Sequence, residues 1–148
     1  MTSEHNSEVS DEAVAAAIAG AQRARDLSYS PYSRFKMGAG IVGSQGEEVI
    51  GTLIENVSLG LAICSERVAL FTAITNGIQP VVLAVCSPRT EDKLTFPCGA
   101  CLQVALELAG PELTVVAVDT DGVSGHAVLR DLLPKAPHRF TPDTRPTD

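Results

Sequence analysis

The sequence lacks the features that mark nucleic-acid-binding and membrane proteins. Lysine and arginine number only 11 against 18 aspartates and glutamates, which gives a formal net charge of −7 and a pI near 4.9. A nucleic-acid polymer is therefore not an expected partner, because phosphate binding needs a basic surface. No segment approaches the roughly 18 consecutive apolar residues that a membrane span needs. The charge does not exclude a small neutral ligand.

Aromatic residues and cysteines are also scarce. Aromatic residues make up 4% of the chain, so aliphatic residues and alanine dominate the 45% apolar content, as is typical of an α/β or α+β protein. The amino terminus, MTSEHNSEVSDE, is polar and has no hydrophobic signal core, so a cytoplasmic location is expected, where thiols stay reduced. The four cysteines are then predicted to be metal ligands, catalytic groups or core residues rather than disulfides.

The 148 residues are expected to form a single α/β domain with five strands and three or four helices. Apolar periodicity and end signals predict helices from Ser10 or Asp11 to about Leu27, over 64–77, over 98–110 and briefly over 129–134. Strands are predicted on both sides of a turn at 44–47, over 81–87, over 113–120 and, after the hairpin signal Asp121–Gly122, over 123–128. We expect a disordered lead-in over 1–9, one domain over 10–140 and a flexible tail over 141–148.

Two cysteines, Cys98 and Cys101, stand at the start of a predicted helix in the stretch FPCGACLQ. This spacing is typical of a redox dithiol, because the helix dipole lowers the pKa of a thiol. Cys64 also opens a predicted helix, so three thiolates would face one metal ion if the two helix starts meet, and sulfur ligands favour zinc. Three ligands leave a fourth position open, as in catalytic zinc sites. A closed structural site would need Cys86, whose apolar strand instead indicates a buried thiol.

Glu66 lies two residues after Cys64. Its simplest role is that of a solvated side chain or a partner of the helix dipole. A carboxylate on the first helical turn can also reach water at a metal without being a ligand itself. Zinc deaminases carry this order of residues, ligand-x-Glu followed by Pro-Cys-x-x-Cys, and three cysteines are allowed among their ligands. Glu66 is therefore the candidate general acid and base.

Four stretches together resemble the small cytidine deaminases that act on free nucleosides: YSPYSRFKMGAGIV, GTLIENVSLGLAICSERVAL, PCGACLQ and LRDLLP. The resemblance covers nearly all of the chain except the first dozen residues and the tail. It implies a three-layer fold with a five-stranded mixed sheet between helices, one zinc ion per subunit, and a homotetramer with sites at subunit interfaces. The activity it implies is hydrolytic deamination of cytidine or deoxycytidine, with Glu66 transferring the protons.

The resemblance also assigns supporting residues around the substrate and the metal. Phe35 matches an aromatic residue that packs beside the nucleoside, and Glu55 matches a glutamate that holds the ribose hydroxyls. Ser65 stands in the pocket where alanine is usual. Around the zinc ion, Arg67 is expected to offset the charge of three thiolates. Pro97 and Gln103 are expected in the same surroundings.

Several positions depart from the family pattern around the sugar and the pocket mouth. Leu53 replaces an asparagine that contacts the ribose, and a leucine can neither donate nor accept a hydrogen bond. Further departures are Leu59 for a tyrosine, Leu102 for an arginine, and Pro137 for a phenylalanine of the neighbouring subunit that Phe140 is expected to replace. Leu53 leaves a modified cytosine nucleoside of the blasticidin type as an alternative substrate. The alternative that is not an enzyme is a closed structural zinc module serving as an interaction domain.

Overall fold

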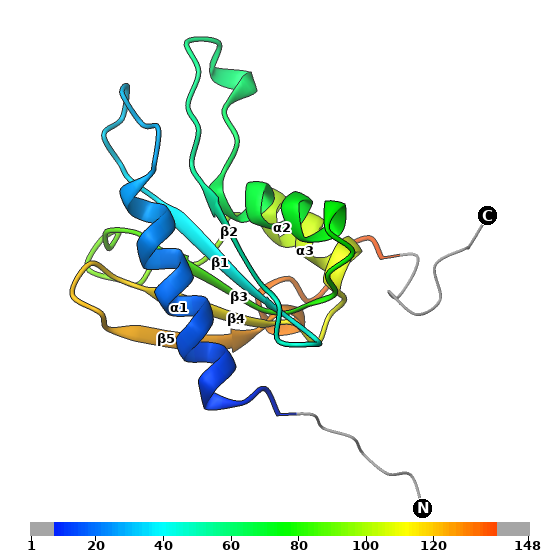
Figure 1. Ribbon diagram of the computed structural model, residues 1–148. Helices are drawn as coiled ribbons and strands as arrows, with labels where there is room; N and C mark the ends of the chain where they lie inside the picture. Colours follow the sequence, from blue (N-terminus) through cyan, green and yellow to red (C-terminus); the bar gives the residue numbers. More distant parts are fainter. Residues whose placement is uncertain (1–7, 139–148) are drawn as a thin grey trace, which may run out of the picture.

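Within residues 8–138, which the computed structural model describes, five strands form one mixed sheet with helices on both faces (Figure 1). The sheet order is β2-β1-β3-β4-β5, with β3 and β4 parallel and the other neighbours antiparallel. The elements are α1 (Asp11–Asp26), β1 (Gly38–Gly43), β2 (Glu48–Thr52), a 3-10 turn (Leu59–Leu61), α2 (Ser65–Thr75), β3 (Pro80–Cys86), α3 (Gly99–Ala109), β4 (Thr114–Val118), β5 (Ser124–Val128) and α4 (Leu129–Leu132). The predicted three-layer α/β architecture is confirmed.

Helix α1 covers one face of the sheet by itself. Ser10 caps it, since its Oγ accepts from the backbone N–H of Ala13 at 3.1 Å. A Cβ atom at Gly40 of β1 would lie 2.2 Å from the carbonyl oxygen of Ala17, so only glycine lets α1 lie this close to the strand.

Helices α2 and α3 cover the opposite face (Figure 1). The buried residues of α2 are Ser65, Glu66, Ala69, Leu70 and Ala73. Helical periodicity places Phe71 and Ile74 or Thr75 on one face with Val68, but Phe71 and Ile74 point outward and are 47% and 38% exposed. The reason is steric, because the small side chains of Ala69 and Ala73 let the helix lie close to the sheet and the bulkier ones are left outside.

The hairpin of β4 and β5 is confirmed, with β5 as an antiparallel edge strand. Its connection is longer than the two-residue signal indicated, because the turn runs over residues 119–123. Asp119 shapes this turn: its Oδ1 accepts from the backbone N–H groups of Asp121 and Val123, both at 2.9 Å. Gly122 adopts a positive φ of 87° there.

The sequence predictions for residues 1–7 and 139–148, including the role of Phe140 and the flexible tail, lie outside the described residues. Among residues 8–138, no helix is both long and apolar enough to cross a membrane.

Candidate metal centre and active site

The amino-terminal ends of α2 and α3 bring three cysteine sulfur atoms together. Cys64 is the N-cap residue of α2, Cys98 is the N-cap residue of α3, and Cys101 follows in the first turn. Their Sγ atoms all lie within 4.8 Å of one another, and those of Cys98 and Cys101 are 3.6 Å apart. Zinc–sulfur bonds of about 2.3 Å place tetrahedral ligands about 3.8 Å apart. The donor set and its spacing therefore fit a zinc ion.

Cys86 does not belong to this cluster. Its side chain is buried in the core between α1 and the sheet, whereas the three clustered cysteines lie at the helices of the other face. The Sγ atom of Cys86 lies 4.0 Å from the carbonyl oxygen of Asp119. The prediction of a buried thiol is confirmed, and Cys86 cannot close the site as a fourth ligand. A cluster of three thiols also favours a metal site over a two-thiol redox pair.

Arg67 supplies positive charge to the sulfur cluster. Its Nη2 donates to Cys64 Sγ at 3.5 Å. The pKa of the Cys64 thiol is lowered because the Cys101 thiol donates a hydrogen bond to it and because Arg67 lies beside it. The pKa of Cys101 is raised in turn, since it keeps its proton to make that bond.

Glu66 lies in the first turn of α2, two residues after Cys64, and is 1% exposed. Burial raises the pKa of its carboxyl group, and the Ser65 hydroxyl opposes this shift by donating to Oε2 at 2.9 Å. The structure thus gives Ser65 a contact with Glu66 in addition to its expected place in the pocket. A buried carboxyl group with a raised pKa beside a metal site is suited to accept and release protons.

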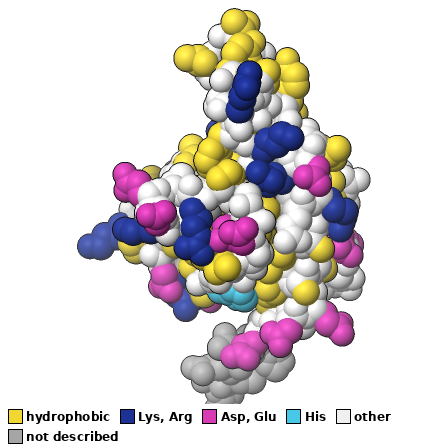
Figure 2. Space-filling model, turned by 90° about the vertical axis from the view of Figure 1, so that its left-hand side faces the viewer, with side chains coloured by type: hydrophobic (Ala, Val, Ile, Leu, Met, Phe, Trp, Pro, Cys, Tyr) yellow, Lys and Arg dark blue, Asp and Glu magenta, His cyan; other side chains and the backbone are white. Residues whose placement is uncertain are grey.

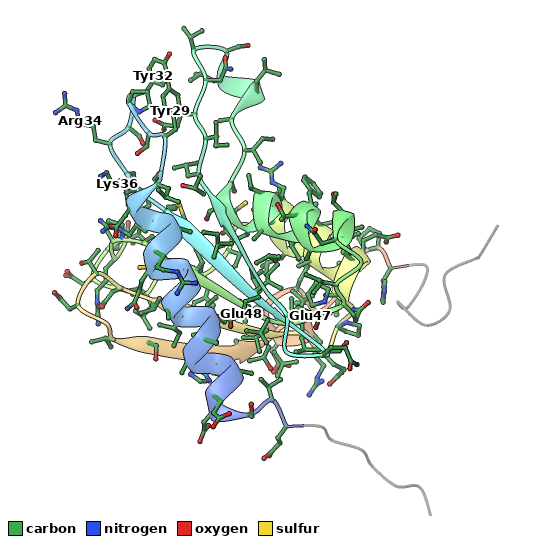
Figure 3. The ribbon with its side chains drawn as sticks, in the orientation of Figure 1. Tyr29, Tyr32, Arg34, Lys36, Glu47 and Glu48 are labelled. Carbon is green, nitrogen blue, oxygen red and sulfur yellow. The ribbon has the colours of Figure 1, made fainter. Side chains whose placement is uncertain are left out.

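Glu55 joins two loops that project from the body of the molecule, residues 28–36 and 53–63, which we call the projecting end (Figures 1 and 3). Its Oε1 accepts from the backbone N–H groups of Tyr32 at 3.0 Å and Ser33 at 3.2 Å. The Ser33 hydroxyl and these N–H groups hold the pKa of Glu55 below its usual range. These bonds hold in place the carboxylate that the resemblance assigns to the ribose hydroxyls.

Two further predicted substrate residues, Phe35 and Leu53, lie on the same two segments. Phe35 is half-buried and its backbone N–H donates to Ser33 Oγ at 3.0 Å. Leu53 follows β2 and is half-buried; its carbonyl oxygen accepts from the Tyr29 N–H, and its N–H donates to the carbonyl oxygen of Met37. A cavity of about 380 Å³ is lined by Ser28, Tyr29, Ser30, Pro31, Arg34 and Lys36, all from the first segment. None of the sulfur ligands lines this cavity.

Three further predicted positions lie on or before α3. Pro97 is buried immediately before Cys98. Gln103 uses its Nε2 to donate to the carbonyl oxygen of Pro137 at 2.8 Å, so it fastens the carboxy-terminal segment to the helix that carries two of the thiols. Leu102 is 6% exposed and belongs to the core between the sheet and α2 and α3. Its predicted place at the pocket mouth is wrong, because the helix turns this side chain into the core.

The comparisons with known proteins agree with this geometry. A family model described as the cytidine and deoxycytidylate deaminase zinc-binding region matches residues 9–117. The chain belongs to this family. It is 39% identical over 119 residues to a cytidine deaminase of Halalkalibacterium halodurans, an alignment that covers 80% of this chain and 89% of that protein. It is 38% identical over 109 residues to a cytidine deaminase of Mycobacterium tuberculosis, covering 74% and 77% of the two chains.

Solved structures of the family share the fold. The crystal structure of cytidine deaminase from Burkholderia pseudomallei superposes with a TM-score of 0.78 at 38% identity, covering 86% of this chain and 99% of that one. The cytidine deaminase structure from Mycobacterium tuberculosis gives a TM-score of 0.71 at 32% identity, covering 86% and 98%. The deaminase fold predicted from the sequence is thereby confirmed.

Sequence reasoning missed one ion pair in the loop that leads to Cys98. Arg89, in the loop before Cys98, donates its Nε to Oδ2 of Asp119 at 2.7 Å. An aspartate at the end of an apolar strand and just before a turn was a signal for Asp119. No local pattern indicated Arg89 as its partner, because the two are 30 residues apart.

Proposed function

We propose that the protein hydrolyses cytidine and deoxycytidine to the uridine nucleoside and ammonia. The observation that carries this proposal is the position of Glu66, a buried carboxyl group on the first turn of the helix that Cys64 begins. The chain is a zinc-dependent aminohydrolase of the deaminase family, and the relatives described above are named cytidine deaminases. Those names support cytidine over the modified cytosine nucleoside.

Cys64, Cys98 and Cys101 would hold one zinc ion per chain. When bound, zinc supplies a Lewis acid that makes water acidic enough to act as a nucleophile near neutral pH. Three thiolates give such a centre a formal charge of −1, which opposes that effect. Arg67 and the amino-terminal ends of α2 and α3 draw negative charge from the sulfur atoms. They therefore help the zinc ion to keep its effect on the acidity of water.

Glu66 moves the protons of the reaction. Its carboxylate accepts a proton from the attacking water and delivers it to the ring nitrogen beside the amino-bearing carbon. It then carries a second proton to the departing amino group, which leaves as ammonia while the water oxygen stays on the ring. Because the Ser65 hydroxyl engages Oε2, we assign these transfers to Oε1.

The nucleoside is held by residues of the projecting end. Phe35 packs beside it, and Oε2 of Glu55 accepts from a ribose hydroxyl while Oε1 keeps segment 28–36 in place. Leu53 contributes only an apolar surface at this position. The sugar is therefore held by fewer hydrogen bonds than the family pattern provides.

The active assembly is proposed to be a homotetramer in the cytoplasm. The projecting end exposes large apolar side chains, among them Leu59 with 81% of its surface accessible, and Figure 2 shows hydrophobic side chains gathered at its tip. Apolar groups that cluster at the surface of one chain favour burial against another chain. A second chain on this end would also cover segments that carry Phe35 and Glu55.

Replacing Glu66 with glutamine tests the proposal, because the amide keeps the size of the side chain but cannot take up the proton. We expect Glu66→Gln to retain the fold and about one zinc ion per chain and to lose nearly all release of ammonia from cytidine. Glu107→Gln on the exposed side of α3 is the matched control and keeps full activity. A Glu66→Gln protein with the turnover of the wild type would refute the assignment.

A further inference from the structure

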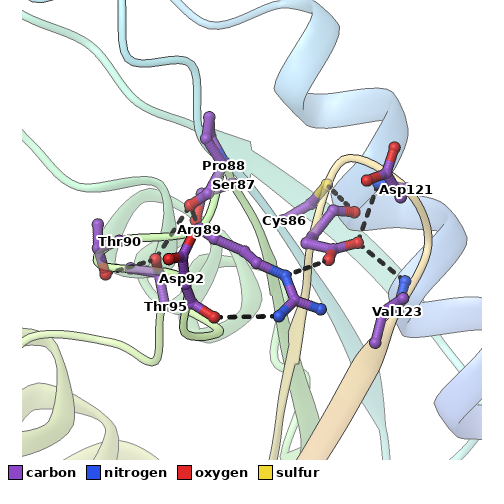
Figure 4. A network of polar contacts seen from close by, with 10 residues as sticks. Cys86, Ser87, Pro88, Arg89, Thr90, Asp92, Thr95, Asp121 and Val123 are labelled. Atoms are coloured by element: carbon purple, nitrogen blue, oxygen red, sulfur yellow. Dashed lines mark hydrogen bonds and ion pairs between the residues drawn. The ribbon is translucent and has the colours of Figure 1, made fainter.

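The loop that leads from β3 to Cys98, residues 87–97, is fastened to the turn between β4 and β5 (Figure 4). We call it the ligand loop. Asp119 of the turn is 3% exposed, and its Oδ2 accepts from Arg89 Nε at 2.7 Å. The same guanidinium donates through Nη1 to the carbonyl oxygen of Asp92 at 3.1 Å. Arg89 thus bridges the turn and the tip of the ligand loop with two separate nitrogen atoms.

The tip of the ligand loop has a backbone that needs such support. Glu91 and Asp92 have φ angles of 51° and 61°, in the left-handed region that favours glycine. Thr90 and Lys93 close this tip by exchanging two backbone hydrogen bonds of 3.0 Å. Left-handed residues other than glycine persist where the surroundings fix them. The bond from Arg89 to the Asp92 carbonyl is one contact that does so.

The base of the ligand loop is fixed as well. Thr95 Oγ1 donates to the carbonyl oxygen of Pro88 at 3.0 Å, which ties the two arms of the loop together. Leu94 and Phe96 lie over Gly125 of β5, where a Cβ atom would be 3.0 Å from Leu94 Cδ1 and 3.9 Å from Phe96 Cζ. Both the tip and the base of the loop therefore rest on the hairpin of β4 and β5.

Cys98 depends on this loop more than the other two cysteines do. Cys101 is buried within α3, and Cys64 is contacted by Arg67 from its own helix. Cys98 is exposed at the N-cap position of α3 and makes no side-chain capping hydrogen bond there. On the side of the helix, its Sγ donates to Cys101 Sγ at 3.6 Å and its carbonyl oxygen accepts from the Leu102 N–H at 2.9 Å. On the other side, its place is set by the chain that enters the helix, namely Phe96 and Pro97 at the end of the ligand loop.

We propose that Arg89 and Asp119 are positioning residues that act through the ligand loop to keep Cys98 within reach of the zinc ion. This inference rests on the proposed function, because it takes Cys64, Cys98 and Cys101 as the zinc ligands. The ion pair touches neither metal nor substrate. Its effect is on how long zinc is retained, and it leaves the chemistry at Glu66 unchanged.

The test measures how fast zinc leaves the full-length protein at 25 °C in the presence of a chelator that changes colour on binding zinc. Asp119→Asn keeps an oxygen for the N–H groups of Asp121 and Val123 but turns an amide nitrogen toward Arg89. Arg89→Gln removes the other half of the pair. We expect each variant to release zinc about tenfold faster, the lower end of the effect of residues that support metal ligands.

Three comparisons separate positioning from a general loss of stability. Arg130→Gln removes an exposed arginine that pairs with Glu112, far along the chain from the ligand loop, and is expected to release zinc at the wild-type rate. Arg89→Lys keeps the charge but not the two-nitrogen bridge, so its rate falls between those of wild type and Arg89→Gln. The double variant is expected to release zinc no faster than either single variant, because the two substitutions break the same ion pair. Zinc-saturated variants keep the wild-type kcat.

The outcomes distinguish this inference from the proposed function. A wild-type protein without bound zinc would overturn the ligand set and this inference with it. A wild-type protein with about one zinc ion per chain, together with variants that release zinc at the wild-type rate, overturns the positioning role alone. Should Asp119→Asn fail to fold, Arg89→Gln decides the question, since the Arg89 side chain is 41% exposed and its removal leaves no cavity in the core.

Discussion

Leu53 is the residue that most directly limits how the sugar is recognised. It follows β2 two positions before Glu55, on the segment proposed to hold the ribose. A polar side chain at this position would add one hydrogen bond to a sugar hydroxyl, which contributes about 1 kcal/mol. We therefore expect Leu53→Asn to raise kcat/KM for cytidine about fivefold.

The comparison substrate for Leu53→Asn is 2′,3′-dideoxycytidine, which has the same base and the 5′ hydroxyl but lacks the 2′ and 3′ hydroxyls. Its kcat/KM is expected to stay unchanged, so the ratio of the two substrates reports the new sugar contact alone. An equal change for both nucleosides would mean that Leu53 acts on the base or on the fold and not on the sugar.

Asp119 makes the stability of the protein depend on pH in acid. Arg89 holds the pKa of its carboxyl group below the usual range, helped by the N–H groups of Val123 and Asp121. A carboxyl group with a lowered folded-state pKa stabilises the fold above its unfolded pKa of about 3.9, and this contribution is lost as the pH falls through the folded-state pKa. The free energies of unfolding of wild type and Asp119→Asn should therefore differ by a constant amount above about pH 5 and converge below about pH 4.

Urea unfolding between about pH 3 and pH 7 measures this difference. Both proteins are measured with an excess of chelator, so that their different zinc retention does not contribute and their difference isolates the carboxyl group of Asp119. Asp121→Asn is the control, because Asp121 enters the network only through its backbone N–H (Figure 4). A gap between wild type and Asp119→Asn that persists unchanged into acid would contradict the assignment of charge to this contact.

Among the elements, the contact of α2 with β2 sets the position of Glu66. A Cβ atom at Gly51 would lie 2.3 Å from the Ala69 nitrogen and 2.5 Å from the Ser65 carbonyl oxygen, both backbone atoms of α2. Gly51→Ala must therefore lift the first turns of this helix from the sheet. We expect it to lower the free energy of unfolding by about 2 kcal/mol, as overpacking typically does, and to lower activity as well.

Gly60→Ala provides the matched control, since a Cβ atom there meets nothing within 4 Å. Urea unfolding midpoints of the two variants test the prediction. Equal stability of Gly51→Ala and wild type would show that α2 can shift without cost, and that Gly51 does not fix the distance between helix and sheet.

The helices and strands also show which features of the fold and the site could be predicted from the sequence alone. The pairing of Cys64-x-Glu66 with Pro97-Cys98-x-x-Cys101 is local chemistry, so the sequence could predict the zinc cluster, and the resemblance added the five-stranded sheet. The outward direction of Phe71 depends on how closely α2 approaches Gly51 and could not be read from periodicity. Leu102 was predicted at the pocket mouth because it departs from the family pattern. The direction in which α3 turns this side chain, into the core, could not be predicted from that departure. The contact of Arg89 with Asp119 joins distant segments that only the fold brings together.

At the scale of the whole molecule, we expect zinc binding to need only one chain and substrate binding to need the assembly of several chains. The three candidate ligands and Glu66 come from one chain and lie between α2 and α3. The projecting end, in contrast, exposes Val57, Leu59 and Leu61 while it carries Glu55. A separated chain should therefore keep its zinc ion but hold the nucleoside poorly.

Leu59→Glu tests this division, because a charge placed in an apolar contact between chains opposes burial of that surface. We expect light scattering to show an assembly smaller than four chains, zinc content to remain near one ion per chain, and kcat/KM for cytidine to fall at least about tenfold. Val123→Glu introduces the same charge at an exposed apolar residue of the β4–β5 turn and should change none of the three. If Leu59→Glu stays tetrameric, the projecting end is not the contact surface. If it dissociates and keeps full activity, each chain holds its substrate alone.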